Sequence, residues 1–147
     1  MRPSRSAHPI VAPYQTFPTQ DGYINIAVGN DGQFASFCRV LGVPEWSSDP
    51  RFATNDARVR RREDLVPLLA GALRERTADD WLERLTARGV PAGKVRGVRE
   101  AIEAAAAAGE PATVDVEHPT AGRLPLVRSP LRLASSPIRP TSPPPRL

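Results

Sequence analysis

The feature that most constrains this chain is a change of hydrophobic period between residues 21 and 44. After the turn pair Asp21-Gly22, the segment from Tyr23 to Val28 alternates polar and apolar residues, which predicts a half-buried strand beginning at Tyr23. A polar loop follows, and the apolar residues beyond it have the spacing of one helical face: Phe34, Phe37, Cys38 and Leu41. Such a stripe predicts an amphipathic helix. The order of strand, polar loop and helix indicates a mixed α and β structure.

The loop between strand and helix, residues 29–32, also sets the helix ends. Asn30 or Asp31 can cap the first turn, and Gly42 followed by Pro44 can end the helix. Free N–H groups at a helix start can bind a phosphate. The loop has neither the G-x-G-x-x-G nor the G-x-x-x-x-G-K-[ST] spacing, so ordinary turn chemistry is the favoured interpretation.

Composition places the chain among globular proteins. It has 147 residues, of which 40% are hydrophobic and 5% aromatic, so a single modest core must be built mainly from Leu, Val, Ile and Ala. No apolar run approaches the ~20 residues that span a bilayer. Arg2 and Arg5 are not followed by an apolar segment, and we therefore expect no signal peptide, no membrane association and a cytoplasmic location.

Few side chains have the chemistry of a metal site or a nucleophile. The single Cys38 lies on an apolar stripe and is expected to be a buried small side chain. Besides it there are only His8 and His118, with no carboxylate cluster near either, so a zinc site is not expected. His118, next to Pro119, is more typical of a turn or packing residue than of an acid or base.

Charge gives a weak indication of partners. The net charge is +4, and the one dense basic run lies at residues 58–62. It lacks the interleaved aromatics of a nucleic-acid surface, and no nucleic-acid partner is expected. A solvated helix face is the favoured interpretation, and contact with an anionic phosphate group is the weaker alternative.

The remaining periodicity predicts four more helical segments and a hairpin. We expect a short helix over residues 55–61, a helix from Glu63 with Pro67 in its first turn, and a helix that follows a capping sequence at Thr77. Residues 89–95 link that helix to an extended piece. An alanine-rich helix over residues 100–108 precedes a hairpin over residues 113–127, and Trp46 and Phe52 are expected to pack on the core.

These elements divide the chain into four expected parts. Residues 1–20 form an extended linker arm, 21–110 a small α/β domain, 111–135 a β-hairpin return segment and 136–147 a Pro-rich tail. The arm and the tail follow from dense proline. The expected fold class is α+β, with short antiparallel strands, four or five helices and an extended Pro-rich tail.

Several motifs occur together in one order. HPIVAPYQTFPTQDGYINIAVGNDGQFASFCRVLG, DPRFATNDARV, GVPAGKV and RSPLRL resemble the second half of family III CoA-transferases, which include formyl-CoA and carnitine-CoA transferases and the related 2-methylacyl-CoA racemases. The resemblance covers the chain from about His8 to Leu147. Ala92 and Lys94 replace Cys and Pro of the family pattern. Arg128 replaces a Gly, which would strain the backbone if that position needs a positive φ.

The resemblance implies an aspartate nucleophile that attacks an acyl-CoA thioester and passes through an anhydride and an aspartyl-CoA thioester. In the family this aspartate lies in an amino-terminal domain that precedes the matched segment, as does a glycine loop that touches substrate. We therefore expect no catalytic residue in this chain and no cofactor, with coenzyme A as a co-substrate. Pro13, Tyr14 and Gln15 are the candidate substrate-proximal residues, although an extended arm with Tyr14 packed on the core explains them equally well.

The resemblance also implies partners. These are an acyl-CoA and a carboxylic acid as substrates, an amino-terminal CoA-transferase domain or second chain, and a homodimer in the full enzyme. An isolated second half would expose apolar surface. Two alternatives to a transferase stay open: part of a 2-methylacyl-CoA racemase, and a non-catalytic remnant or interaction module.

Overall fold

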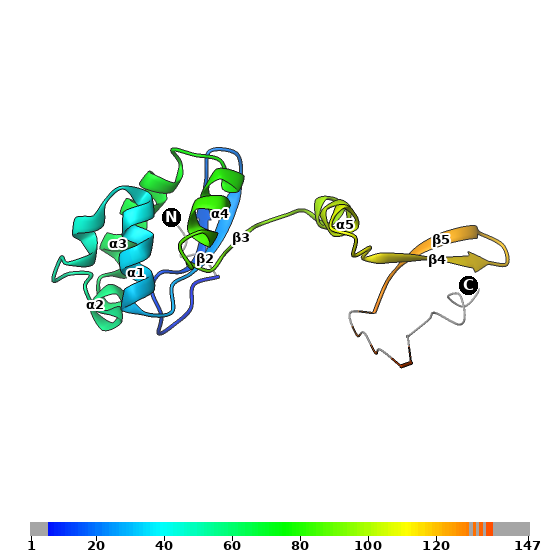
Figure 1. The fold of residues 1–147 in the computed structure, drawn as a ribbon, viewed down its shortest axis with the longest axis horizontal. Coiled ribbons are helices and arrows are strands. Elements are labelled where there is room, and N and C mark those ends of the chain that lie inside the picture. Colours follow the sequence, from blue (N-terminus) through cyan, green and yellow to red (C-terminus); the bar gives the residue numbers. More distant parts are fainter. Residues whose placement is uncertain (1–5, 130, 132, 134, 137–147) are drawn as a thin grey trace. The chain divides into compact units, whose positions relative to one another are not determined.

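The computed structural model describes residues 6–129, 131, 133, 135 and 136 of the 147-residue chain. It divides into two compact units, Met1–Val95 and Arg96–Leu147, and each is described on its own (Figure 1). The four-part division expected from the sequence stays a prediction. Within the described residues, no helix combines the length and the apolar character needed to cross a membrane.

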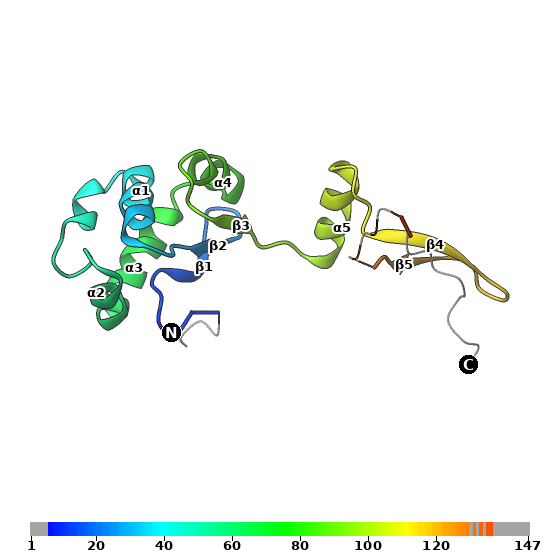
Figure 2. The same ribbon diagram turned by 60° about the horizontal axis from the view of Figure 1, so that its bottom comes forward.

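A three-stranded antiparallel sheet is the centre of the first unit. Its order is β1 (Tyr14–Pro18), β2 (Tyr23–Ala27), β3 (Ala92–Lys94), and the strands are seen side by side in Figure 2. The predicted strand start at Tyr23 is confirmed. The structure adds β1 within the expected extended arm, because the proline-flanked segment pairs along its whole length with β2.

The sheet has one buried face. Gln15 lies opposite Ile26, and Phe17 lies opposite Ile24, so the strand alternation puts all four on the same side. All four are buried, whereas Tyr23 on the other side is exposed. The sheet therefore packs its helices on one face only.

Five helical segments supply the rest of this unit. They are α1 (Asp31–Leu41), the 3-10 helix η1 (Pro44–Ser47), α2 (Asn55–Arg60), α3 (Arg62–Leu73) and α4 (Ala78–Thr86). Their apolar sides and the buried face of the sheet form one core, to which the predicted Phe52 and Trp46 both contribute. The indole Nε1 of Trp81 donates to the Leu73 carbonyl oxygen at 2.7 Å, which ties α4 to the end of α3.

Helix ends follow the local sequence. The Asn30 side chain accepts from the Gln33 N–H at 2.9 Å, and Gly42 ends α1 in the left-handed region at φ 80°. Thr77 caps α4 by accepting from the Asp80 N–H at 3.3 Å. These three predictions are confirmed because a cap depends on residues that are close in sequence.

Pro67 departs from its prediction. Helix α3 begins at Arg62, so Pro67 is inside the helix and beyond its first turn. A proline there removes one helical hydrogen bond to the carbonyl of Glu63. Both residues are exposed, so water can satisfy that carbonyl, and the buried leucines on the opposite side keep the helix continuous.

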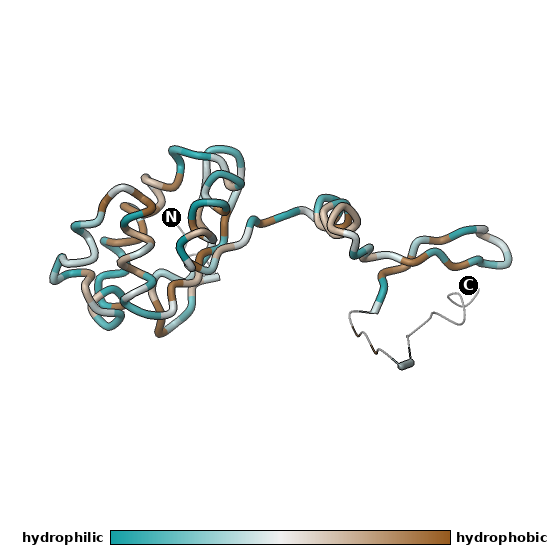
Figure 3. The backbone as a smooth tube through the Cα atoms, in the orientation of Figure 1, coloured by the Kyte–Doolittle hydropathy of each residue, from teal (hydrophilic) through white to brown (hydrophobic). Residues whose placement is uncertain are grey.

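The second unit contains α5 (Val98–Ala107) and the hairpin of β4 (Thr113–His118) and β5 (Gly122–Val127). The predicted hairpin is confirmed, with Pro125 opposite Asp115. None of its described residues is fully buried. Figure 3 nevertheless shows hydrophobic residues along both strands, so this unit has apolar side chains without a core.

Two further expectations are tested in this unit. No described residue other than glycine has a positive φ, so the strain considered for Arg128 does not arise. Its N–H donates to the Ala112 carbonyl oxygen at 2.8 Å and extends the hairpin. The Pro-rich tail predicted over residues 136–147 lies, apart from Ser136, outside the described residues. The fold is α+β, with five α-helices and short antiparallel strands within the part of the chain that the structure describes.

Candidate functional site

The segment that leads into β1 is held by side chains from α2 and α3. We name Asn55, Arg58 and Arg62 the arm clamp, because together they bind the backbone of residues 8–12. This segment contains the quoted HPIVAP motif, and the clamp lies in the quoted DPRFATNDARV motif and just after it. Two motifs far apart in the sequence therefore meet in space.

Asn55 pairs with the arm through both atoms of its amide. Its Oδ1 accepts from the Ala12 N–H at 3.1 Å, and its Nδ2 donates to the Ile10 carbonyl oxygen at 2.9 Å. A side-chain amide that binds one backbone donor and one acceptor replaces a missing neighbouring strand. The arm is therefore fixed in register as well as in direction.

Arg58 is the deepest member of the clamp, with no exposed surface. Its Nε donates to the Ala12 carbonyl oxygen at 2.6 Å, and one terminal nitrogen donates to the Phe52 carbonyl oxygen at 2.9 Å. The other pairs with Asp31 Oδ1 at 2.8 Å. The guanidinium also lies 4.3 Å from the centre of the Phe34 ring, so every face of this buried charge has a partner.

Arg62 completes the clamp from the first turn of α3. One of its terminal nitrogens donates to the carbonyl oxygens of His8 and Val11, at 2.7 and 3.1 Å. Only Arg60 and Arg61 of the run at residues 58–62 match a solvated helix face, and each pairs with an aspartate of its own helix region. The prediction of a solvated face is wrong for Arg58.

The candidate substrate-proximal residues start where the clamp ends. Pro13 is buried, and its carbonyl oxygen accepts from the Val28 N–H at 3.0 Å. Gln15 is 6% exposed and lies on the core side of β1, whereas Tyr14 is 39% exposed on the other side. The Tyr14 ring stacks on His8 with 5.3 Å between ring centres. Sequence reasoning named Tyr14 and His8 separately and did not predict this pair.

The aspartates are all engaged in structural contacts. Asp21 accepts from the Ala78 N–H at 2.7 Å and from the Thr19 hydroxyl at 3.1 Å, and the backbone hydrogen bond to Ala78 is the main reason that the pKa of Asp21 lies below its ordinary value. The others form ion pairs: Asp31 with Arg58, Asp49 with Arg51, Asp56 with Arg60, Asp64 with Arg61, Asp79 with Lys94, Asp80 with Arg76 and Arg84, and Asp115 with Arg123.

The cysteine and the second histidine both have structural surroundings. Cys38 is buried in the core, and burial raises the pKa of its thiol to about 12, so the thiolate nucleophile is not formed near neutral pH. His118, the last residue of β4, accepts through Nδ1 from the N–H groups of Thr120 and Ala121 at 3.3 and 3.1 Å and so stabilises the turn that follows. Within the described residues, no group of three His, Cys, Asp or Glu side chains could hold a metal ion.

One sequence signal could have revealed the clamp. Arg58, Arg62, Leu65 and Leu69 are spaced by four, three and four residues, so the two arginines continue the stripe that the buried leucines of α3 occupy. A basic residue on an apolar stripe indicates a buried hydrogen-bonding role. The density of charge in residues 58–62 had favoured a solvent-exposed position for these arginines.

Comparison with known proteins identifies the family of this chain. The sequence model of CoA-transferase family III matches residues 1–147. Succinyl-CoA:glutarate CoA-transferase of Mus musculus is 32% identical over 97% of this chain and 33% of the relative. Succinate--glutarate CoA-transferase of Agrobacterium fabrum is 33% identical over 97% of this chain and 36% of the relative.

A solved structure agrees with the same assignment. The crystal structure of a CAIB/BAIF family protein from Brucella suis superposes with a TM-score of 0.80 and 37% sequence identity. The superposition includes 97% of this chain and 36% of the Brucella suis protein. The chain thus spans about a third of the length of the proteins it matches. Its sequence and its fold both show that the chain belongs to CoA-transferase family III.

Proposed function

We propose that this chain is the carboxy-terminal part of a CoA-transferase that moves CoA between an acyl-CoA and a carboxylic acid. The observation that carries the proposal is the family match over residues 1–147, combined with relatives whose names are those of CoA-transferases. Since the chain spans about a third of those relatives, the complete reaction requires polypeptide that this sequence does not contain.

The missing polypeptide would supply the nucleophile. A carboxylate attacks the thioester carbonyl, expels CoA thiolate and forms an acyl anhydride; CoA then attacks the enzyme's side of the anhydride and releases the acyl carboxylate. The resulting aspartyl-CoA thioester passes CoA to the incoming acid. The nucleophile must be free to approach the thioester, whereas each aspartate in this chain already accepts from a backbone or side-chain donor.

The arm clamp would act as a positioning device in that enzyme. It fixes residues 8–12 on α2 and α3, and thereby sets where Tyr14 and Gln15 begin β1. The exposed Tyr14 ring, stacked on His8, is the better candidate for substrate contact, because Gln15 faces the core. A polar ring pair of this kind can contact both apolar and hydrogen-bonding parts of a ligand.

The names of the relatives suggest which acids to test first. They name glutarate, oxalate and D-citramalate, and all three are dicarboxylic acids. We therefore propose a dicarboxylate as the acid substrate. The proposal for the acid is separate from the proposal for the reaction, since another acid would still be exchanged by the same chemistry.

Reconstitution tests the proposal. The chain is mixed with the amino-terminal segment of the Agrobacterium fabrum relative that precedes the matched region, and succinyl-CoA is supplied with isotopically labelled glutarate. We expect labelled glutaryl-CoA only when both polypeptides are present. Arg60→Met, which alters an exposed pair, should leave turnover unchanged, whereas Arg58→Met should reduce it.

Other outcomes separate the alternatives. Exchange of the α-hydrogen of a 2-methylacyl-CoA with solvent deuterium, without transfer of CoA, would identify the racemase. No reaction with complementary segments from several relatives would favour a non-catalytic remnant or interaction module. Turnover by the purified chain alone, lost on replacing one of its own aspartates, would overturn the proposal.

A further inference from the structure

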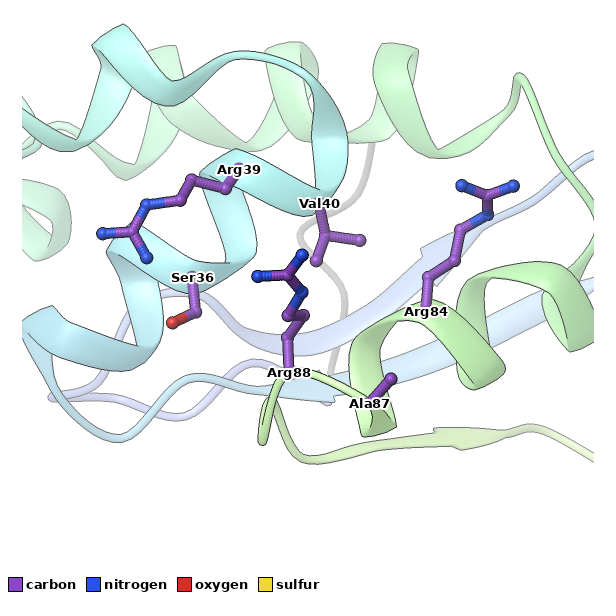
Figure 4. Close-up of a pocket in the computed structure, with 6 residues that line it drawn as sticks. All are labelled: Ser36, Arg39, Val40, Arg84, Ala87 and Arg88. Carbon is purple, nitrogen blue, oxygen red and sulfur yellow. The ribbon is translucent and has the colours of Figure 1, made fainter.

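A hollow of about 340 Å³ lies between α1 and α4 of the first unit, remote in sequence from the arm clamp. Figure 4 shows its lining: Ser36, Arg39 and Val40 from α1, Arg84 from α4, and Ala87 and Arg88 just after α4. Its volume falls at the lower end of the range of about 300–1,000 Å³ that is typical of small-ligand sites. Three of its six lining residues are arginines.

Two of the three exposed arginines of this hollow bind no carboxylate among the described contacts. Arg84 pairs with Asp80 at 2.9 Å, but among the described ion pairs and side-chain hydrogen bonds none involves the guanidinium of Arg39 or Arg88. Most basic side chains of the first unit behave differently, since they bind a carboxylate or backbone carbonyls: Arg51, Arg58, Arg60, Arg61, Arg62, Arg76, Arg84 and Lys94. Of the described arginines up to residue 95, only Arg74 shares the unpaired state of Arg39 and Arg88.

Helix polarity explains part of this arrangement. Arg39 lies in the last turn of α1, and Arg88 follows the end of α4, where the negative ends of the helix dipoles favour cations. Each dipole end is equivalent to only about half an elementary charge. The dipoles thus account for one arginine at each helix end, and they leave positive charge where the two helix ends meet.

The hollow brings a hydroxyl and basic side chains from two helices to one place. In Figure 4 the Ser36 side chain lies between the guanidinium groups of Arg39 and Arg88, while Arg84 points to the far side of Val40. A guanidinium binds two oxygens of a phosphate through parallel N–H donors, and a serine hydroxyl can donate to a third. Phosphate offers enough oxygens for all three groups at once.

We propose that Ser36, Arg39 and Arg88 form a binding site for a phosphate group. The ligand is either free inorganic phosphate or a phosphate carried by a larger molecule, of which the phosphates of coenzyme A are the first to test. The phosphate site requires only the first unit of this chain, whereas the choice of coenzyme A as the first carrier to test rests on the proposed transferase function.

Titration of the full 147-residue chain with inorganic phosphate at constant ionic strength tests the site. We expect saturable binding in the millimolar range or tighter, with the largest amide shifts in nuclear magnetic resonance spectra at the end of α1 and after α4. Arg39→Gln and Arg88→Gln should each weaken binding about tenfold, the loss expected for one charged hydrogen-bonding group. Arg74→Gln is the matched control, since Arg74 is unpaired and lies at a helix end outside the hollow.

Two results would overturn the site: phosphate binding that does not saturate, and a loss in Arg74→Gln equal to that in the two site variants. Unfolding curves of all variants show whether weaker phosphate binding comes from loss of the site or from loss of the folded structure. A parallel titration with coenzyme A and with dephospho-coenzyme A, which lacks the 3′-phosphate, identifies the source. If coenzyme A binds more tightly than dephospho-coenzyme A, and Arg88→Gln removes this difference, the site binds the 3′-phosphate. If the two bind equally, the site binds another phosphate of the molecule.

Discussion

The unit that ends at Val95 and the unit that begins at Arg96 both contain helices and strands, but they differ in how far their side chains are buried. The first packs helices and strands around a core in which a dozen large side chains are fully buried. The second has one helix and one hairpin, and no fully buried residue among those described. All eight aromatic residues of the chain precede residue 82. Burial of large side chains, not secondary structure, therefore distinguishes the two.

From this difference we predict that the first unit is stable by itself and that the second depends on other polypeptide. Val98 and Val127 are 80% and 83% exposed, and an isolated two-stranded hairpin is marginal in water. Since the chain spans about a third of its relatives, we infer that the second unit completes its packing on other polypeptide. Four predictions test the comparison, in order of decreasing effect.

The largest effect is expected from Arg58→Met. The substitution keeps much of the side-chain volume but leaves the buried carbonyls of Ala12 and Phe52 without their donor, at a cost of about 1–3 kcal/mol each. We expect the free energy of unfolding of the first unit to fall by about 4 kcal/mol in urea titrations followed by tryptophan fluorescence. Both tryptophans, Trp46 and Trp81, lie in this unit.

Arg60→Met is the control for that variant, because Arg60 is the same residue type on the same helix and forms an exposed ion pair. Exposed pairs contribute about 0–1 kcal/mol. Equal losses in the two variants would show that Arg58 does not stabilise the core through its buried hydrogen bonds.

A matched pair of leucines compares the two units directly. Leu69 is fully buried in the core, whereas Leu126 of β5 is half-buried. Leu69→Ala should lower the free energy of unfolding by about 3 kcal/mol, through lost burial and the cavity that remains. Leu126→Ala should leave the tryptophan-detected transition unchanged. A shift of that transition by Leu126→Ala would show that the units unfold together.

Asn55→Ala should have an intermediate effect. It removes the side chain that binds Ala12 and Ile10 and leaves one backbone donor and one acceptor without these partners. The expected loss is about 1–2 kcal/mol, accompanied by faster hydrogen exchange at the amide of Ala12. Asn25→Ala, at an exposed position of β2, controls for loss of an asparagine. Unchanged exchange at Ala12 in Asn55→Ala would contradict the role of the clamp.

The smallest effect concerns acid stability. The pKa of Asp21 in the folded chain lies below its ordinary value of 3.8, chiefly because its carboxylate accepts from the Ala78 N–H. Its contribution to stability is therefore complete above that ordinary value and is lost as the pH falls below it toward the depressed folded value. Asp21→Asn should flatten the decline of stability over that acidic range, measured by thermal unfolding at successive pH values.

Asp56→Asn is the comparison for this titration, since Asp56 contacts only Arg60 on the surface of α2 among the described side chains. The two variants should have similar melting temperatures at the most acidic pH and should differ at neutral pH. An identical pH dependence of Asp21→Asn and the unmodified chain would refute the assignment.

Local chemistry explains which parts of the fold could be predicted. The strand at Tyr23, the caps at Asn30 and Thr77, and the hairpin of β4 and β5 depend on neighbouring residues, and the sequence predicted all of them. Arg58 could not be placed in the same way. Its partners Ala12 and Asp31 lie 46 and 27 positions away, so its burial depends on the tertiary fold.

The candidate sites follow the same division. The aspartates lie in turns, caps and helix positions that the sequence also indicates, and the expectation that this chain holds no catalytic residue stays a prediction. The sequence does not reveal the stacking of His8 on Tyr14 or the presence of Arg39 and Arg88 in one hollow. Each of these contacts requires two separate segments of the chain to meet. The substrate-proximal role of Pro13, Tyr14 and Gln15 stays a prediction.

The attachment of the arm also has a mechanical consequence. Backbone atoms of residues 8–12 are bound laterally by Asn55, Arg58 and Arg62, so a pulling force applied at Ser6 would load these side chains in shear. The arm also binds β1 directly, since the Ser6 hydroxyl accepts from the Thr16 N–H and the His8 N–H donates to the Tyr14 carbonyl oxygen, so tension would be shared between β1 and the helices α2 and α3. A displacement of this arm would therefore be transmitted to the core of the first unit.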